Sequence, residues 1–182
     1  MPERLQARLA LSVYQMDMRN ELDFDLQDFR YVNIGRSRHR GLEAGLTVEA
    51  PGATGGFANY TRQDATSRFG ENAGKQLKAV PRDAFALGLT RTPSQGLGLA
   101  LTATTVRHTW LDDANARPLA PYTRLDLRAS YPVVGVRLTL DVRNLLDRAY
   151  STTGYPDPGG SGTLLLYPAA RRVVTIGIES RR

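Results

Sequence analysis

The sequence predicts an all-β fold: an antiparallel meander of about eight long strands that is part of a transmembrane β-barrel, or forms a small closed or open barrel by itself. Apolar and polar residues alternate with period two along most of the 182 residues, which places them on opposite faces of a sheet. Short and long connections follow one another, as is typical of outer-membrane barrels. No run approaches the roughly 20 apolar residues that a membrane helix needs.

The first four strands are expected at residues 4–18, 29–50, 55–66 and 77–91. In three of them an apolar residue occupies every second position, as in Leu9-Leu11-Val13, Leu42-Ala44-Leu46 and Phe85-Leu87-Leu89. The strand at 55–66 has the weakest pattern, because the large residues Phe57 and Tyr60 fall on opposite faces.

The last four strands are expected at residues 96–110, 121–131, 136–147 and 170–180. Their alternating apolar positions are Leu97-Leu99-Leu101, Leu125-Leu127-Ala129, Leu138-Leu140-Val142 and Val174-Ile176-Ile178. Short turns rich in Pro and Gly are predicted at 51–54, 92–96 and 132–135, as tight hairpins require. The other connections, near 19–28, 67–76, 111–120 and 148–169, are longer and predict loops on the opposite rim.

The hairpin formed by 121–131 and 136–147 has one apolar face and one charged face. The charged face carries five candidate residues of a lumen charge ladder: Arg124, Asp126, Arg128, Asp141 and Arg143. If Tyr131 pairs with Val136, Asp126 lies opposite Asp141 and Arg124 opposite Arg143, with Asp126–Arg143 and Arg128–Asp141 as diagonal pairs. The ladder braces the barrel wall or provides a path for charged ligands.

Composition narrows the functional classes. Cysteine is absent and only two histidines occur, so neither a thiolate site nor a histidine-based metal site is expected. The net charge of +6, which comes largely from arginine, suits anionic partners such as nucleic acid, lipid A phosphates or an acidic ligand. No Ser/His/Asp arrangement is apparent, so no enzyme is predicted. The N-terminal residues carry charges and no apolar segment, so no signal peptide is expected within this chain.

A soluble lipocalin-like binder would show the same alternation turned inside out, with apolar residues around a cavity. The asymmetry of the connections favours the membrane barrel. Aromatic residues near strand ends favour it as well, since they suit interfacial girdles: Tyr14, Trp110, Tyr122, Tyr131 and Tyr150. An independent eight-stranded outer-membrane barrel with a structural or adhesive role is a further alternative.

Several segments, in this order and spacing, resemble a known family. They are Tyr31-Val32-Asn33-Ile34-Gly35, Arg40-Gly41-Leu42-Glu43, Val80-Pro81-Arg82, the run from Pro121 to Tyr131, Asp141-Val142-Arg143-Asn144-Leu145-Leu146-Asp147-Arg148-Ala149-Tyr150 and the run from Tyr167 to Arg172. Over most of its length the chain resembles the C-terminal part of the β-barrel of a TonB-dependent outer-membrane receptor of the siderophore type.

This resemblance implies uptake of a scarce small-molecule ligand, typically a ferric siderophore, across the outer membrane of a Gram-negative cell. It implies a barrel of about 22 strands with a plug, contact with lipid and lipopolysaccharide, and energy from the TonB complex through an N-terminal region. No cofactor is expected to be bound directly, and no nucleic acid. Residues 1–182 are expected to be a C-terminal barrel segment without plug or signal peptide. The end at Ile178–Arg182 lacks the family's terminal aromatic residue, which suggests a truncated reading frame.

Four residues in or beside the long connections are candidate ligand contacts. Trp110, Tyr155 and Tyr167 could stack on aromatic groups of a siderophore, and Arg117 could meet its negative charge; girdle or loop-packing roles explain the aromatics equally well. The cluster Arg36–Arg40 is expected to be rim and lumen charge, or a contact to anionic lipopolysaccharide. Asn144-Leu145-Leu146-Asp147 is expected to end a strand through local turn bonds.

Overall fold

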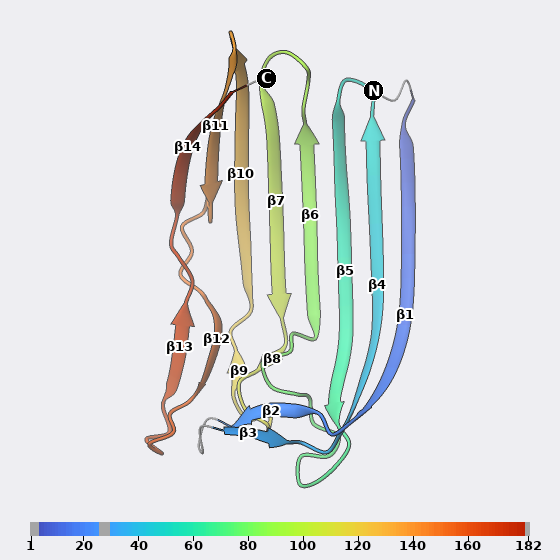
Figure 1. Ribbon diagram of the computed structural model, residues 1–182, viewed down its shortest axis with the longest axis vertical. Helices are drawn as coiled ribbons and strands as arrows, with labels where there is room; N and C mark the ends of the chain where they lie inside the picture. The colour runs from blue at the N-terminus through green and yellow to red at the C-terminus, as the bar shows by residue number, and fades with distance from the viewer. Residues whose placement is uncertain (1–3, 26–29, 181–182) are drawn as a thin grey trace.

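The computed structural model describes residues 4–25 and 30–180. Eight strands form one antiparallel sheet in the order β1-β4-β5-β6-β7-β10-β11-β14 (Figure 1). Their bounds are β1 Gln6–Arg19, β4 Arg36–Ala50, β5 Thr54–Ser67, β6 Asp83–Arg91, β7 Gly98–Arg107, β10 Tyr122–Val133, β11 Val136–Arg143 and β14 Val173–Ser180. The predicted fold class is therefore confirmed. Within the described residues, no helix has the length and apolar character needed to cross a membrane.

Three small hairpins occupy three of the four long connections, and all lie at the same end of the sheet (Figure 1). They pair β2 (Leu22–Asp25) with β3 (Arg30–Asn33), β8 (Thr109–Trp110) with β9 (Pro118–Leu119), and β12 (Ser151–Pro156) with β13 (Leu164–Pro168). The short turns lie at the opposite end. The predicted division into a short-turn rim and a long-loop rim is present, but three of the four long connections contain a hairpin.

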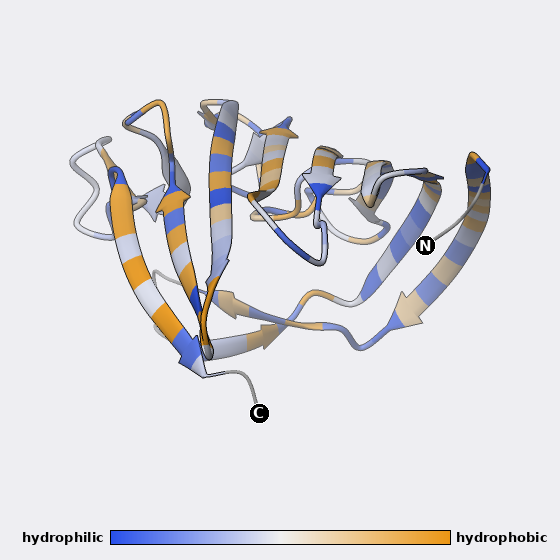
Figure 2. Cartoon of the chain, turned by 90° about the horizontal axis from the view of Figure 1, so that it is seen from above, coloured by the Kyte–Doolittle hydropathy of each residue, from blue (hydrophilic) through white to orange (hydrophobic). Residues whose placement is uncertain are grey.

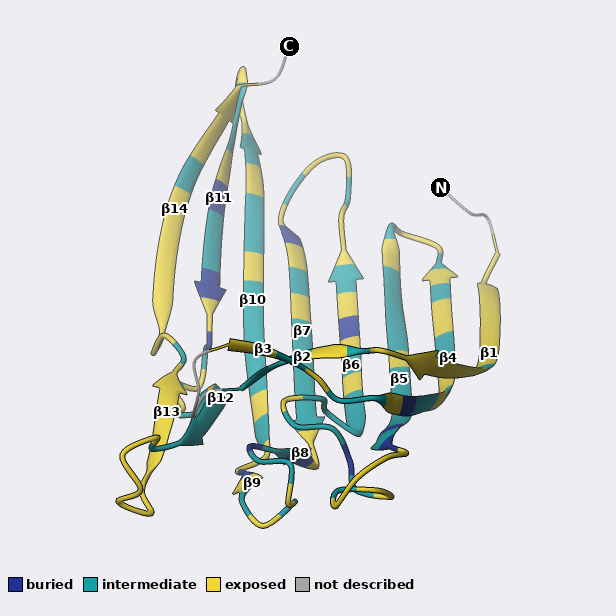
Figure 3. Ribbon diagram, turned by 60° about the horizontal axis from the view of Figure 1, so that its bottom comes forward, coloured by how far each residue is buried: buried dark blue, intermediate teal, exposed yellow. Residues whose placement is uncertain are grey.

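The eight-stranded sheet curves into an open trough. Figure 2, seen from above, shows the strands as an arc with the β2–β3 hairpin crossing its concave side. In the described sheet β1 and β14 each have one partner strand, and they do not pair with each other. Figure 3 shows these two strands among the most exposed. The strands described here thus form part of a barrel wall and do not close into a small barrel.

A continuous apolar face runs across all eight strands. One row of direct cross-strand partners consists of Ala7, Val48, Gly56, Leu89, Leu101, Leu127, Val142 and Val174. Large side chains of this face are exposed, and Ile176 on β14 is 77% exposed. No described element covers this face, so its residues do not surround a cavity. The lipocalin-like alternative required apolar residues around a cavity.

The polar face is the concave one. Ser37 on β4 and Thr139 on β11 belong to it and are buried. Ser37 donates a hydrogen bond to Glu21, which directly precedes the β2–β3 hairpin on the concave side. The apolar face is consequently convex, which is the arrangement of a barrel with lipid outside and a polar lumen inside.

Two predicted girdle residues lie on the wrong face for that role. The Tyr14 hydroxyl donates to Gln63 Oε1 over 3.1 Å, and its ring covers Gly41, where a Cβ would come within 2.4 Å of the ring. Tyr122 stacks on Tyr150 with a ring separation of 4.4 Å. Since even-numbered positions of β1 and β10 face the lumen, Tyr14 and Tyr122 lie on the concave, polar face of the sheet. Tyr131 faces outward and is exposed, as a girdle residue requires.

Several predicted strands end earlier than expected because the backbone adopts a positive φ. The segment 29–50 divides into β3 and β4 at Gly35 (φ +80°), and its first residue, 29, lies outside the described residues. β7 ends before His108 (φ +56°), and β11 ends before Asn144 (φ +52°). β6 begins at Asp83, so residues 77–82 belong to the preceding loop. Residues 26–28 of the predicted first loop and residues 181–182 also lie outside the described residues.

The predicted register of the β10–β11 hairpin is wrong by two residues. Tyr131 pairs with Leu138, and Val133 pairs with Val136, so the turn consists of Val134 and Gly135 alone. Gly135 has φ +74°, which suits the second position of such a turn. Pro132 remains in the strand instead of opening a four-residue turn. A shift of two residues preserves the faces, but it changes every cross-strand partner.

Candidate functional site on the concave face and in the long loops

The charged ladder exists on the concave face, and the predicted pair of Arg128 with Asp141 is formed, although the two residues are direct rather than diagonal partners. Arg128 lies directly opposite Asp141, with 3.8 Å between Nη1 and Oδ1, and its Nη2 lies 3.1 Å from Glu179 of β14. Arg128 therefore links three adjacent strands. Arg124 contacts Asp126 two residues along its own strand, with 2.9 Å between Nε and Oδ2.

The predicted pairs of Arg124 with Arg143 and of Asp126 with Asp141 are not formed, because the register differs. Arg143 makes no ion pair with any residue that the structure describes. The pairs that do form are partly exposed, and such pairs contribute about 0–1 kcal/mol each. Their geometry supports a bracing role between β10, β11 and β14.

Asn144 anchors the end of β11 and is 2% exposed. Its side-chain amide donates to the carbonyls of Arg148 and Ala170 over 2.8 and 3.2 Å, and its Oδ1 accepts from the Arg148 N–H over 3.0 Å. The Asn144 backbone N–H donates to Asp126 Oδ1 over 2.9 Å. The segment 144–147 thus ends the strand through local bonds, as predicted, and also ties β10 to the segment that leads into β14.

Asp147 completes this junction. Its carboxylate accepts hydrogen bonds from Arg171 and from the Arg172 backbone N–H, which lie at the approach to β14. Those bonds hold the pKa of Asp147 well below its ordinary value. The segment from Asp141 to Tyr150, which carries part of the family resemblance, therefore joins the end of β11 to the approach to β14.

Lys78 joins two of the long connections to the β2–β3 hairpin. Its Nζ lies 2.5 Å from Asp23 of β2 and 2.9 Å from Asp113 of the β8–β9 connection. Burial lowers the pKa of Lys78, but hydrogen bonds to the two carboxylates outweigh burial, so the pKa is raised. Asn115 adds a second link, because its amide donates to the Gln76 carbonyl over 2.8 Å.

The candidate ligand residues are partly brought together. Arg117 Nη1 donates to the carbonyls of Gly162 and Thr163 over 3.1 and 3.3 Å, and this joins the β8–β9 connection to the tip of the β12–β13 hairpin. On that hairpin the rings of Tyr155 and Tyr167 lie 5.8 Å apart. A hydrogen bond with Tyr167 raises the pKa of Tyr155. Trp110 lies in β8, opposite Pro118, with no ring contact to either tyrosine in the described structure.

One polar cluster was not predicted from the sequence. His39 Nε2 lies 3.2 Å from Ser37 Oγ and 3.5 Å from Glu21 Oε2, beneath the β2–β3 hairpin. Both groups lie near the same ring nitrogen. A catalytic triad also needs a bond that orients the other ring nitrogen, and none is found among the described residues. The cluster fastens the hairpin to β4. The sequence feature that could have indicated this cluster is the spacing of Ser37 and His39, which places them on one face of a strand. The position of Glu21 could not be inferred from the sequence. Among the described residues, no group of three or more His, Cys, Asp or Glu side chains that could hold a metal ion is found.

Comparison with protein families shows a match. The sequence model described as "TonB dependent receptor-like, beta-barrel" matches residues 2–145. A probable TonB-dependent siderophore receptor, PiuA from Acinetobacter baumannii, is 30% identical over 139 residues, which are 69% of this chain and 19% of the relative.

Solved structures share the fold. The PiuA crystal structure has a TM-score of 0.75 at 24% identity and covers 96% of this chain. The ferric yersiniabactin uptake receptor FyuA from Yersinia pestis has a TM-score of 0.80 at 22% identity, again over 96% of the chain. This chain spans 26% of the PiuA structure and 27% of the FyuA structure, about a quarter of each.

Proposed function

We propose, because this chain belongs to the TonB-dependent receptor family, that residues 1–182 form the C-terminal segment of the β-barrel of an outer-membrane uptake receptor. The observation that carries the proposal is the unbroken register of eight strands, with an uncovered apolar convex face and a polar concave face. A wall with lipid outside and a plugged, polar lumen inside needs that division. Membership of a receptor family also agrees with the prediction that the chain is not an enzyme.

The transported ligand is a ferric siderophore or a similarly scarce nutrient. The relatives support this class, since their names include a siderophore receptor and a ferric yersiniabactin uptake receptor. In the complete receptor, extracellular loops capture the ligand, the TonB complex acts on the N-terminal region, and a path through the lumen opens. This segment supplies wall and part of the extracellular cup, and transports nothing unaided. Its outer surface contacts membrane lipid and lipopolysaccharide.

Within this proposal the long-loop rim is the ligand-facing end. Arg117 supplies a guanidinium whose known bonds go to exposed loop carbonyls, and Tyr155 and Tyr167 supply neighbouring rings. Trp110 provides a further ring in the adjacent connection. Cationic and aromatic side chains are the groups that bind an anionic, aromatic ferric complex. The concave ladder at Arg124, Asp126, Arg128, Asp141 and Arg143 braces the wall below them.

Uptake by cells that produce the protein tests the function. Iron-restricted cells lacking the gene are compared with complemented cells, using ⁵⁵Fe complexes of catecholate, hydroxamate and citrate-type siderophores. TonB-dependent uptake of at least one complex is expected only in complemented cells. Arg117→Gln and the double change Tyr155→Leu/Tyr167→Leu should reduce ligand binding, whereas Lys75→Gln, in a neighbouring loop, serves as the matched control. Absence of the protein from the outer membrane would refute the proposal.

A further inference from the structure

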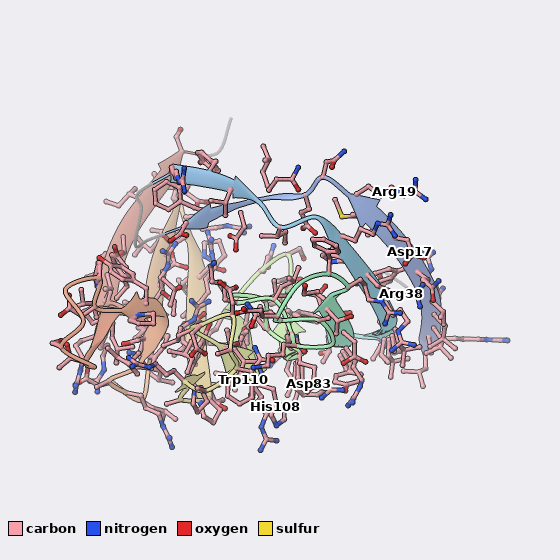
Figure 4. All side chains as sticks on the ribbon, turned by 90° about the horizontal axis from the view of Figure 1, so that it is seen from below. Asp17, Arg19, Arg38, Asp83, His108 and Trp110 are labelled. Carbon is pink, nitrogen blue, oxygen red and sulfur yellow. The ribbon has the colours of Figure 1, made fainter. Side chains whose placement is uncertain are left out.

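Two of the three methionines of the chain lie together on the concave face. Met16 and Met18 occupy alternate positions of β1, so their side chains project to the same side of the sheet. Figure 4 shows Arg19, the last residue of β1, directed away from the trough, and the neighbouring even-numbered positions face into it. Met16 is 52% exposed and Met18 is 39% exposed. Both thioethers are therefore accessible from the trough, close to the long-loop rim.

One of the two histidines lies beside these methionines. His39 of β4 is the direct cross-strand partner of Met16, and Ser37 is the partner of Met18. Directly opposed residues have Cβ atoms about 4.5–5.5 Å apart, and diagonal neighbours are about 7–8 Å apart, which long side chains can span. An ion held at the imidazole is therefore within reach of both sulfur atoms.

The contacts of His39 leave one ring nitrogen available to a cation. The Ser37 hydroxyl donates its hydrogen to Glu21, so the Ser37 oxygen can only accept from the imidazole, at 3.2 Å from Nε2. Glu21 Oε2, 3.5 Å from the same nitrogen, is also an acceptor. In the neutral ring Nε2 therefore carries the hydrogen and Nδ1 carries the lone pair. In the described structure Nδ1 has no hydrogen-bond partner.

This arrangement is typical of a histidine that binds a metal ion. Such a histidine donates its other ring N–H to a carboxylate or a similar acceptor, which fixes the tautomer and the orientation of the ring. Glu21 provides that acceptor both directly and through Ser37. Its negative charge also offsets the charge of a bound cation.

Core packing does not account for the two methionines. Methionine commonly fills irregular gaps in apolar cores, but Met16 and Met18 lie on the polar face of the wall and remain exposed. The next position on that face, Tyr14, is used for a polar contact, since its hydroxyl donates to Gln63. Exposed thioethers among polar neighbours suit a role as ligands.

We propose that Met16, Met18 and His39 bind a monovalent copper ion, Cu⁺, through two thioether sulfurs and the imidazole Nδ1. Thioethers are soft ligands that select Cu⁺, whereas Zn²⁺ takes thiolate, imidazole and carboxylate ligands. The chain contains no cysteine that could form a competing thiolate site. The inference goes beyond the proposed function, because it needs only the β1–β4 register and the contacts of Glu21.

Methionine methyl signals test the site directly. The protein is isolated in mild detergent from cells that produce it, with its methionine methyl groups labelled with ¹³C. Ag⁺, a redox-inert ion with the same preference for soft ligands, is added as the nitrate, and Cu⁺ is added without oxygen. One equivalent of either ion should shift the signals of Met16 and Met18 and no other methionine signal. The single changes Met16→Leu and Met18→Leu assign the two signals.

The affinity for Cu⁺ is measured by competition with a coloured Cu⁺ chelator. The double change Met16→Leu/Met18→Leu nearly preserves side-chain volume and removes both sulfurs. It should weaken binding by more than about a hundredfold, beyond the loss of about 10–100-fold that is typical of a supporting group. Glu21→Gln removes such a supporting group and should weaken binding by about tenfold.

Two control variants separate the site from general metal binding. His108→Gln removes the other histidine, which Figure 4 shows directed away from the trough, and should bind Cu⁺ as the wild type does. The second control adds Leu9→Met/Leu11→Met to the double methionine change. It moves the two thioethers to the convex face of β1 with the same spacing, and it should not restore binding.

Three results would overturn the inference: no shift of the two methyl signals at one equivalent, an equal loss of affinity in His108→Gln, or tighter binding of Zn²⁺ than of Cu⁺. If the double methionine variant does not fold, the wild-type methyl shifts and the effect of Glu21→Gln still decide. Cu⁺ binding without ferric uptake would support the metal site and contradict the receptor proposal. Ferric uptake without Cu⁺ binding would do the reverse.

Discussion

Arg171 holds the Asp147 carboxylate with two hydrogen bonds, from Nε to Oδ1 over 3.0 Å and from Nη2 to Oδ2 over 2.9 Å. The Arg172 backbone N–H adds a third bond over 2.9 Å. These contacts fasten the segment that ends β11 to the segment that begins β14. The junction therefore holds β11 and β14 in register at the end of the sheet where β11 ends and β14 begins.

Asp147→Asn should lower the temperature at which the detergent-solubilised protein loses its folded gel mobility. The change removes the charge that both arginine bonds require. Because the pKa of Asp147 is lower in the folded protein, its contribution is present above the ordinary aspartate value near 3.8 and is lost as pH falls below it. The difference between wild type and variant should therefore shrink on acidification. Asp157→Asn, at a hairpin tip, is the control, and a constant difference across pH would contradict the explanation.

Asn144→Ala should destabilise the protein by about 2–4 kcal/mol, because at least two buried polar groups lose their partners. Alanine also tolerates the positive φ of this position poorly. Asn144→Gly separates the two effects, since glycine relieves the backbone but still lacks the amide. Chemical denaturation in detergent should rank the wild type above Gly and Gly above Ala. A glycine variant as stable as the wild type would show that the side-chain bonds contribute little.

Paired cysteines report the β10–β11 register. Ser130 and Thr139 are direct partners, so Ser130→Cys/Thr139→Cys should form a disulfide on mild oxidation. Ser130→Cys/Arg137→Cys, which matches the register expected from the sequence, should remain reduced. The chain has no other cysteine, so non-reducing peptide mapping reads the result directly. Oxidation of the second pair in preference to the first would refute the observed register.

Lys78→Met should loosen the β2–β3 hairpin by about 1–2 kcal/mol, since two partly buried charge-assisted bonds are lost. Amide hydrogen exchange in residues 22–25 and 30–33 should become roughly tenfold faster. Because the pKa of Lys78 is raised, its contribution is present below about 10.5 and is lost as pH rises through the folded value. Lys75→Met, whose ammonium bonds only to the Ala114 carbonyl in the described structure, should leave the hairpin unchanged.

The sheet was predictable because each strand encodes its faces locally. Alternation at Leu42-Ala44-Leu46 or Val174-Ile176-Ile178 needs no knowledge of a partner strand. Phe57 and Tyr60 obscured the pattern of β5, and the structure explains how Phe57 is accommodated. Phe57 lies over Gly88, where a Cβ would meet its ring at 2.1 Å, so the large inward side chain fills space that a glycine leaves.

The strand ends and the site required information from distant residues. Asn144 ends β11 because Arg148 and Ala170 satisfy its amide, and Ala170 is 26 positions away. Glu21 reaches Ser37 only because a hairpin crosses the trough. The contacts of Arg117 with the β12–β13 tip likewise depend on how two loops pack. Whether Trp110, Arg117, Tyr155 and Tyr167 contact a ligand stays a prediction.

The two-residue turn at Val134–Gly135 has an evolutionary consequence. Side chains alternate strictly along β10 and β11. Inserting or deleting one residue in either strand therefore exchanges the apolar and polar faces from that point onward. A change of two residues keeps both surfaces and merely slides the partners. Length variation in this hairpin among related genes should therefore occur in even steps, and an odd step should be accompanied by a compensating bulge.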